Sequence, residues 1–179
     1  VYKYDYAKNL LFQIVTLHSF TDLKIVVLTD ATGDEEFSFL KKLGHCWDDA
    51  MSMRFFASDM SDALDISTYL ENIFISRSKK ETNQFSISDG QYYLIVCDKA
   101  SMYRDLNIVK DVLNSKINYG FSLVMFDDKV KNIPNKCSYF VNYGLSEATC
   151  FESEIRDDQL KKFIPEIYFD HFIDIDKYC

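Results

Sequence analysis

Short apolar runs alternate along this chain with stretches whose apolar residues recur every three or four positions. The runs are rich in β-branched and aromatic residues and predict strands at 24–30, 53–59, 92–97 and 120–128. The periodic stretches between them predict amphipathic helices. Nearly continuous apolar strands that alternate with such helices are typical of a parallel sheet covered on both faces. The pattern therefore predicts an α/β fold, a three-layer sandwich around a mostly parallel sheet.

The expected helices are bounded by recognisable end signals. The first covers 6–19, where the apolar residues form one stripe. The second begins with the acidic turn Asp34–Glu35 and stops at Gly44, and Ser61 is the expected N-cap of the third. The fourth carries its apolar stripe on Met102, Leu106, Val109 and Leu113.

The last part of the chain has weaker signals. Two further strands, at 137–144 and 148–154, are expected before a final helix that begins near Asp157. We expect residues 1–155 to form one α/β domain and residues 156–179 to form a helix that leads to the next domain. Because this tail is rich in apolar residues, docking against a neighbouring domain or subunit is the preferred interpretation, and packing on its own sheet is the alternative.

Composition and charge narrow the class of function. Lys and Arg number 20 against 28 Asp and Glu, a net charge of −8, so the chain would repel a nucleic acid backbone. The five cysteines are odd in number and lack CxxC pairs, which argues against a disulfide framework or a structural zinc site and favours a reducing, cytoplasmic setting. No apolar stretch approaches the ~18 residues of a membrane span. The sequence starts at Val1, and we expect it to be a segment of a longer protein.

An aspartate follows each of the four predicted strands. Asp30, Asp59 and Asp98 end the first three, and Asp127 and Asp128 end the fourth. Ligands of open parallel sheets bind beyond these carboxyl ends, so two interpretations compete. Each aspartate, taken alone, is best explained as an acceptor for the free N–H groups of the next helix or turn. Alternatively, Asp98 has the position of the strand-terminal carboxylate that organises the magnesium ion in P-loop nucleotide hydrolases.

The rest of a nucleotide site is missing from the sequence. The five glycines never fall at the spacing of the phosphate loop G-x-x-x-x-G-K-[ST]. Lys99 stands where a hydrolase would place its water-activating glutamate, and Lys99 and Lys129 are the only evident cations near the strand ends. We therefore predict no catalytic residue, no cofactor and no metal, and we assign Asp98 only as a degenerate Walker-B-like position.

Two other clusters are better explained by structural roles than by metal binding or catalysis. The run from His45 to Asp49, "HCWDD", has no second ligand pair at metal-site spacing, so Trp47 is expected to anchor the turn after the second helix. Cys97 could be combined with His18 or His45 as a nucleophile and base. It lies inside an apolar strand, however, where a thiol stays protonated and inert.

Several segments together resemble one known family. They are "LLFQIVTLHSFTDLKIVVLTD", "FSFLKKLGHCWDD", "MRFFASD", "YYLIVCDKA" and "NYGFSLVMFDD", which span most of residues 8–152. They resemble the nucleotide-hydrolase-like domain that precedes the first ATPase module in the FtsK/SpoIIIE-type motor of type VII secretion, called EssC or EccC. The most specific part is "LHSFTDLKIVVLTD" followed downstream by Leu-Gly-His-x-Trp.

The resemblance implies a RecA-like, degenerate P-loop NTPase fold in a membrane-anchored, oligomeric bacterial protein that exports small helical WXG100-type proteins. It places this domain at the cytoplasmic face of the membrane, with the neighbouring ATPase and membrane-proximal domains as partners. The expected function is that of a non-catalytic module for assembly, coupling or regulation of the adjacent ATPases. The alternatives are an active nucleotide hydrolase whose phosphate loop lies upstream of Val1, and a docking module for the exported proteins.

Overall fold

The computed structural model describes residues 2–80, 85–86, 88, 90–143 and 148–152. The predicted final helix and the tail lie outside these residues, as does part of the polar loop before the third main strand. What is said below of arrangement and contacts concerns the described residues.

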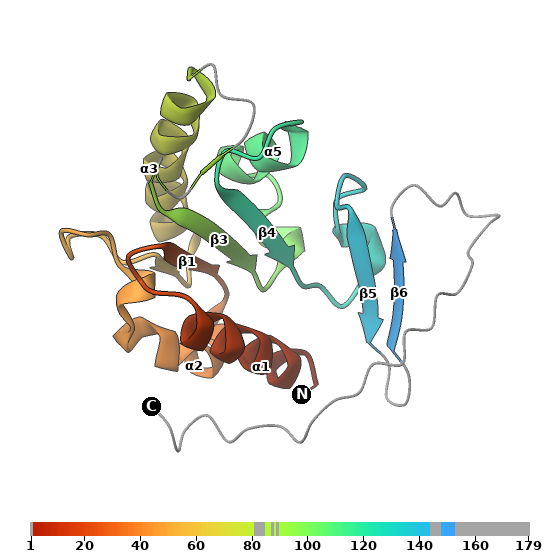
Figure 1. Ribbon diagram of the computed structural model, residues 1–179. Helices are drawn as coiled ribbons and strands as arrows, with labels where there is room; N and C mark the ends of the chain where they lie inside the picture. Colours follow the sequence, from red (N-terminus) through yellow and green to blue (C-terminus); the bar gives the residue numbers. More distant parts are fainter. Residues whose placement is uncertain (1, 81–84, 87, 89, 144–147, 153–179) are drawn as a thin grey trace.

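The centre of the molecule is a four-stranded parallel sheet (Figure 1). Its strands are β1 (Leu23–Leu28), β2 (Phe56–Ala57), β3 (Tyr92–Cys97) and β4 (Phe121–Met125), in the spatial order β2-β1-β3-β4. All neighbours in the sheet run parallel, which confirms the predicted α/β class with its parallel sheet.

Helices cover both faces of the sheet (Figure 1). The helices are α1 (Tyr2–Leu17), α2 (Ala31–Glu36), α3 (Met60–Ser78), α4 (Ala100–Tyr103) and α5 (Asn107–Asn114). Side chains of α1 and of the segment after α2, Phe37 and Leu40 among them, pack on one face, and side chains of α3, α4 and α5 pack on the other. The arrangement is a three-layer sandwich, as predicted.

Alternation along the strands divides the core into two halves. Val26 and Ile95 belong to the half under α3 and α5, whereas Ile25 and Val96 belong to the half under α1. Successive side chains of a strand point to opposite faces, so a strand that is covered on both sides must be apolar throughout. This explains why β1 is fully buried along its whole length.

The predicted strand at 53–59 is wrong in extent, because β2 has two residues. The chain before it is folded into a turn around Asp48, whose carboxylate accepts hydrogen bonds from the backbone N–H groups of Ser52 (2.6 Å) and Met53 (2.9 Å). Trp47 and Arg54 form an isolated bridge across the base of this turn. The backbone therefore reaches the sheet only at Phe55, whose carbonyl accepts the N–H of Val27, and β2 begins at Phe56.

The second predicted helix is also different in the structure. Asp30, not the Asp34–Glu35 turn, marks its start, and α2 ends at Glu36. Tighter 3₁₀ turns follow at Ser38–Lys42 and Gly44–Cys46, so Gly44 opens a turn instead of ending the α-helix. The reason is the burial of Phe37, Phe39 and Leu40, which are too close in sequence to share one narrow helical stripe.

Two more helix boundaries need correction. The N-cap of α3 is Asp59, which accepts the N–H of Asp62 at 3.0 Å, and Ser61 lies inside the first turn. The predicted fourth helix is split into α4 and α5, because Leu106 has an extended backbone (φ −59°, ψ 142°) between them. Met102, assigned to the buried stripe, is 37 % exposed.

A separate antiparallel hairpin lies beyond β4 (Figure 1). It consists of β5 (Tyr139–Tyr143) and β6 (Ala148–Glu152), which confirms the two weaker strands predicted there. Within the parts of the chain that the structure describes, no helix combines the length and the apolar character that crossing a bilayer requires.

Candidate functional site

The strand order creates a crevice between the carboxyl ends of β1 and β3. After β1 the chain moves to β2 on one side, and after β3 it moves to β4 on the other. Ligands of open α/β sheets bind at such a switch point. Thr29 and Asp98 directly follow the paired residues Leu28 and Cys97, so they stand side by side at this point.

Asp98 is fully buried and held by three side chains. Its Oδ2 accepts hydrogen bonds from the hydroxyls of Thr29 (2.8 Å) and Tyr4 (3.1 Å). Its Oδ1 forms an ion pair with Lys3 Nζ at 2.6 Å, and the same ammonium donates to the Asp98 carbonyl at 3.2 Å. Oδ2 thus accepts two hydrogen bonds, whereas Oδ1 has the ion pair with Lys3 and no hydrogen bond within the described part of the chain.

Lys3 and Tyr4 are the site residues that the sequence interpretation missed. They reach Asp98 from the first turn of α1, which lies on the sheet with its start at the carboxyl ends of the strands. One signal was available, because a lysine in the first turn of a helix faces the positive end of the helix dipole. Such a placement is unfavourable unless an acid elsewhere compensates it, and here Asp98 does.

The tyrosine of this cluster remains protonated. Burial, and then the negative charge of Asp98, raise the pKa of Tyr4 well above its ordinary value of 10.0. Its hydroxyl therefore acts as a hydrogen-bond donor to the carboxylate at any physiological pH.

Gly33 and Tyr103 complete the walls of the crevice. A Cβ on Gly33 would lie 1.8 Å from Thr29 Oγ1 and 2.5 Å from Asp98 Oδ2, so the first turn of α2 is pressed against this pair. From the other face, the hydroxyl of Tyr103 donates to the Thr29 carbonyl, and burial raises the pKa of Tyr103 to about 12. The crevice is filled from both helical layers.

Two of the five strand-end aspartates cap the helix that follows their strand, as predicted. Asp30 accepts the N–H groups of Thr32 (3.0 Å) and Gly33 (3.1 Å) at the start of α2, and Asp59 caps α3. Asp98 does not follow this rule. These caps occupy backbone N–H groups that could otherwise bind a phosphate.

The aspartate at the end of the fourth strand, Asp127, accepts a hydrogen bond from α4, the helix that follows β3. Asp127 accepts the N–H of Ser101 in α4 at 3.0 Å, the N–H of Lys129 at 3.1 Å and the side-chain amide of Asn132 at 2.7 Å. Asp128 is exposed. The start of α4 is thereby closed by an acid from a neighbouring strand.

Lys99, which stands directly after Asp98 in the sequence, pairs with Asp30. Its Nζ lies 3.4 Å from Asp30 Oδ2. Although partial burial works in the opposite direction, the charge of Asp30 raises the pKa of Lys99. Burial likewise opposes the shift at Asp30, where the N–H of Gly33 and the charge of Lys99 lower the pKa.

The carboxyl group of Asp127 is expected to make the stability of the fold depend on pH. Burial works in the opposite direction, but the hydrogen bonds from Asn132, Ser101 and Lys129 lower the pKa of Asp127 from 3.8 to about 2. A carboxyl group whose pKa is lower in the folded than in the unfolded state stabilises the fold at pH values above the unfolded-state pKa. This contribution is lost as the pH falls toward the folded-state pKa. We expect Asp127→Ala to destabilise the protein above about pH 5, with a difference that shrinks toward pH 2.

Urea denaturation at a series of pH values measures this difference. Asp128→Ala, at the exposed neighbouring carboxylate, is the control and should change the free energy of unfolding by less than about 0.5 kcal/mol. A difference for Asp127→Ala that is constant from pH 7 to pH 2 would contradict the assignment.

The other two sequence clusters are structural. Trp47 Nε1 donates to the Lys41 carbonyl at 3.3 Å and the Arg54 guanidinium lies 4.5 Å from its ring centre, so Trp47 anchors this turn as predicted. His45 is buried, with Nε2 2.8 Å from the His18 carbonyl. Cys97 is fully buried, and burial raises the pKa of its thiol, as the inert interpretation requires.

The fold and the crevice define a doubly wound α/β domain whose ligand position is filled by its own side chains. Among the described residues, no group of three or more His, Cys, Asp or Glu side chains is arranged to hold a metal ion. Comparison with family models, with curated proteins and with solved structures finds no match to this chain.

Proposed function

We propose that this domain is a non-catalytic, ATPase-like module of RecA-like fold in a membrane-anchored type VII secretion motor. Its role is the assembly, coupling or regulation of the adjacent ATPase domains at the cytoplasmic face of the membrane. The resemblance of residues 8–152 to the lead domain of that motor family suggests the setting. The parallel sheet with a strand-terminal aspartate is compatible with it.

One observation supports the non-catalytic part above all others. The carboxylate that would hold a magnesium ion is fully buried and bonded to Lys3, Tyr4 and Thr29. In a working nucleotide site, this oxygen pair must be accessible to the ion and its water ligands. Here the ammonium of Lys3 occupies the position beside the carboxylate where a cation would stand.

The same contacts favour a second candidate, the active hydrolase with its phosphate loop upstream. In the motif G-x-x-x-x-G-K-[ST] the lysine and hydroxyl residue open a helix, and the hydroxyl and a strand-terminal aspartate hold the magnesium ion. Lys3 and Tyr4 open α1 in this order, and the Tyr4 hydroxyl meets Asp98. Tyr2 replaces the second glycine of the motif and Tyr4 replaces its serine or threonine, which is why we prefer the non-catalytic proposal.

Calorimetric titration with Mg-ATP tests the proposal. We expect no binding at micromolar nucleotide, either in residues 1–179 or in this domain extended by the residues before Val1 and lacking the neighbouring ATPase modules. In the parent protein, Asp98→Asn is expected to leave the ATPase rate within about twofold of wild type, because the other modules carry it. Lys99→Ala is the matched control. Micromolar binding by this domain, or loss of its turnover in Asp98→Asn alone, would establish the hydrolase instead.

A further inference from the structure

The exposed side of α3 carries an apolar stripe. Met60, Leu64 and Ile75 expose 37 %, 53 % and 45 % of their surface. In a helix of 3.6 residues per turn, Leu64 and Ile75 lie about 20° apart around the axis, and Met60 lies about 40° to the other side of Leu64. The stripe runs for 75 − 60 = 15 residues, roughly 22 Å, along the outside of the molecule (Figure 1).

These three apolar residues lie outside the core. The buried apolar side chains of α3 are those of Ala63, Ile66 and Leu70, which belong to the core cluster on this face of the sheet. A single exposed apolar residue is ordinary on a protein surface. Three on one stripe form the pattern that a helix presents to a partner helix.

The polar residues of the stripe already have partners within the chain. Thr68 donates its hydroxyl to the Leu64 carbonyl at 2.9 Å. Glu71 accepts the hydroxyl of Ser67 at 2.6 Å and the side-chain amide of Asn107 in α5 at 3.4 Å. A second helix that packed on the stripe would therefore not leave these groups without hydrogen bonds.

Charge is divided between the two ends of α3. Its first half carries Asp62 and Asp65 and no base. Its last turn and the two residues that follow carry Arg77, Lys79 and Lys80 and no acid. Arg77 is buried and donates to two backbone carbonyls, whereas the other four residues are exposed and form no ion pair among the described residues. The helix dipole favours an acid in the first turn, which accounts for Asp62 but not for Asp65 in the second.

A second copy of the same helix, in the antiparallel direction, complements this division. The basic end of each copy would lie beside the acidic half of the other, whereas a parallel copy would place acid beside acid. A two-fold axis perpendicular to both helices relates such a pair, so every contact occurs twice and each flank of the stripe meets the same flank of the other copy. Asp65 lies about 100° beyond Leu64 and Lys79 about 40° beyond Ile75, on the same flank.

We propose that two copies of this chain associate through antiparallel α3 helices, with Leu64 of one copy beside Ile75 of the other and Asp65 near the other copy's Lys79. One helix from each copy makes a smaller interface than the ~1,200 Å² of stable complexes, so the association is weak. The net charge of −8 does not prevent it at about 0.15 M salt, where charges more than about 8 Å apart are screened. The proposal does not depend on the function proposed above.

Sedimentation equilibrium of residues 1–179 at about 0.15 M salt tests the proposal. A monomer–dimer equilibrium is expected at concentrations between about 10 µM and about 1 mM. Leu64→Lys, in the stripe, should raise the dissociation constant at least about tenfold. Leu17→Lys is the matched control, because Leu17 is 78 % exposed at the end of α1, and it should leave the constant within about twofold.

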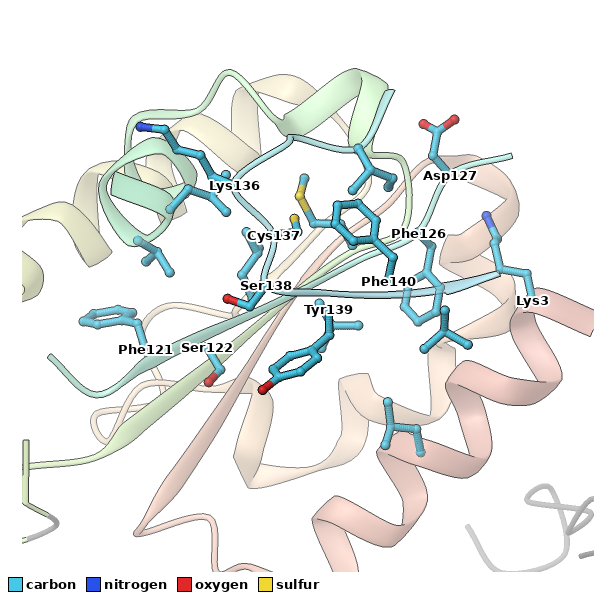
Figure 2. A pocket seen from close by; sticks show the side chains of 18 of the residues that line it. Lys3, Phe121, Ser122, Phe126, Asp127, Lys136, Cys137, Ser138, Tyr139 and Phe140 are labelled. Atoms are coloured by element: carbon cyan, nitrogen blue, oxygen red, sulfur yellow. The ribbon is translucent and has the colours of Figure 1, made fainter. Parts of the chain in front are cut away.

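A different apolar surface has its own control. A groove of about 870 Å³ lies beside β4, and Tyr139 is among its lining residues (Figure 2). None of the described residues that line this groove belongs to α3. Tyr139→Lys should therefore also leave the dissociation constant within about twofold. Loss of the dimer in this variant would place the contact at the groove and overturn the proposal.

Reversal of charge tests the direction of the helices. Asp65→Lys brings like charges together in an antiparallel pair and should raise the dissociation constant about two- to tenfold. This is expected although the net charge falls in magnitude, from −8 to −8 + 2 = −6, which by itself favours association. Lys79→Asp should also weaken the dimer, and the double variant should return to within about twofold of wild type. In a parallel pair, each single reversal would only exchange one like-charge contact for another.

Three further results would overturn the proposal. They are a monomer at all concentrations up to about 1 mM, which would leave the stripe to a different protein; a dimer that Leu64→Lys does not weaken; and a dimer that neither single charge reversal weakens. The substituted residues are all exposed, so the variants should fold, which urea denaturation checks.

Discussion

Lys3→Met is expected to lower the free energy of unfolding by about 3 kcal/mol, since it leaves a buried carboxylate without its counter-charge. Methionine keeps the length and helix propensity of lysine, so the change isolates the ammonium. Asp98 has no exposed surface, whereas the Lys3 side chain is 21 % exposed. Asp98→Asn should therefore cost less, about 1 to 2 kcal/mol, because the freed lysine can turn toward water.

The double variant makes this prediction specific. Lys3→Met combined with Asp98→Asn should be more stable than the sum of the two single losses implies, which a double-mutant cycle by urea denaturation measures. Lys8→Met is the matched control on the same helix. It removes the ion pair with Glu36, in which both side chains are partly exposed, and should cost less than about 1 kcal/mol. If Lys3→Met costs no more than Lys8→Met, the buried pair does not stabilise the fold.

Gly33→Ala is expected to destabilise the protein by about 3 kcal/mol, although alanine is the better helix former. The new methyl group would lie 1.8 Å from Thr29 Oγ1 and 2.5 Å from Asp98 Oδ2, and both atoms belong to short, buried side chains that are hydrogen-bonded to each other. Thr32→Ala, at an exposed position of the same helix, is the control for urea denaturation.

A rescue experiment follows from the same geometry. Thr29→Ala removes the nearer of the two atoms, so the combination with Gly33→Ala should cost less than the sum of the single changes. A Gly33→Ala protein as stable as wild type would show that α2 can move away from the Asp98 cluster.

The sheet could be predicted from the sequence because each strand is apolar on both faces, a pattern that depends only on neighbours along the chain. The contact between Lys3 and Asp98 could not, because it joins residues 95 positions apart. Periodicity indicates that a face is buried but not which segment buries it. Asp30 and Asp98 follow similar strands, yet one caps a helix and the other fills the crevice, because only Asp98 lies level with Thr29 at the switch point.

The wrong helix boundaries have a common physical cause. Propensity and end signals are local, while the structure breaks the second and fourth predicted helices where tertiary contacts require it. Phe37 and Phe39 are buried in quick succession, and Tyr103 is tied to the Thr29 carbonyl of the sheet just before the chain straightens at Leu106. The short β2 likewise depends on the turn that Asp48 closes.

The pairing of β1 with β3 also bears on how this polypeptide is made. Leu23 of β1 is paired with Tyr92 of β3. After Leu23 has been synthesised, 92 − 23 = 69 further residues must therefore leave the ribosome before this pair can form. At 5–20 residues per second, the apolar strand β1 waits roughly 3 to 14 s with one edge unpaired. Nascent-chain chaperones would therefore bind the first quarter of the chain until the second half of the sheet is synthesised.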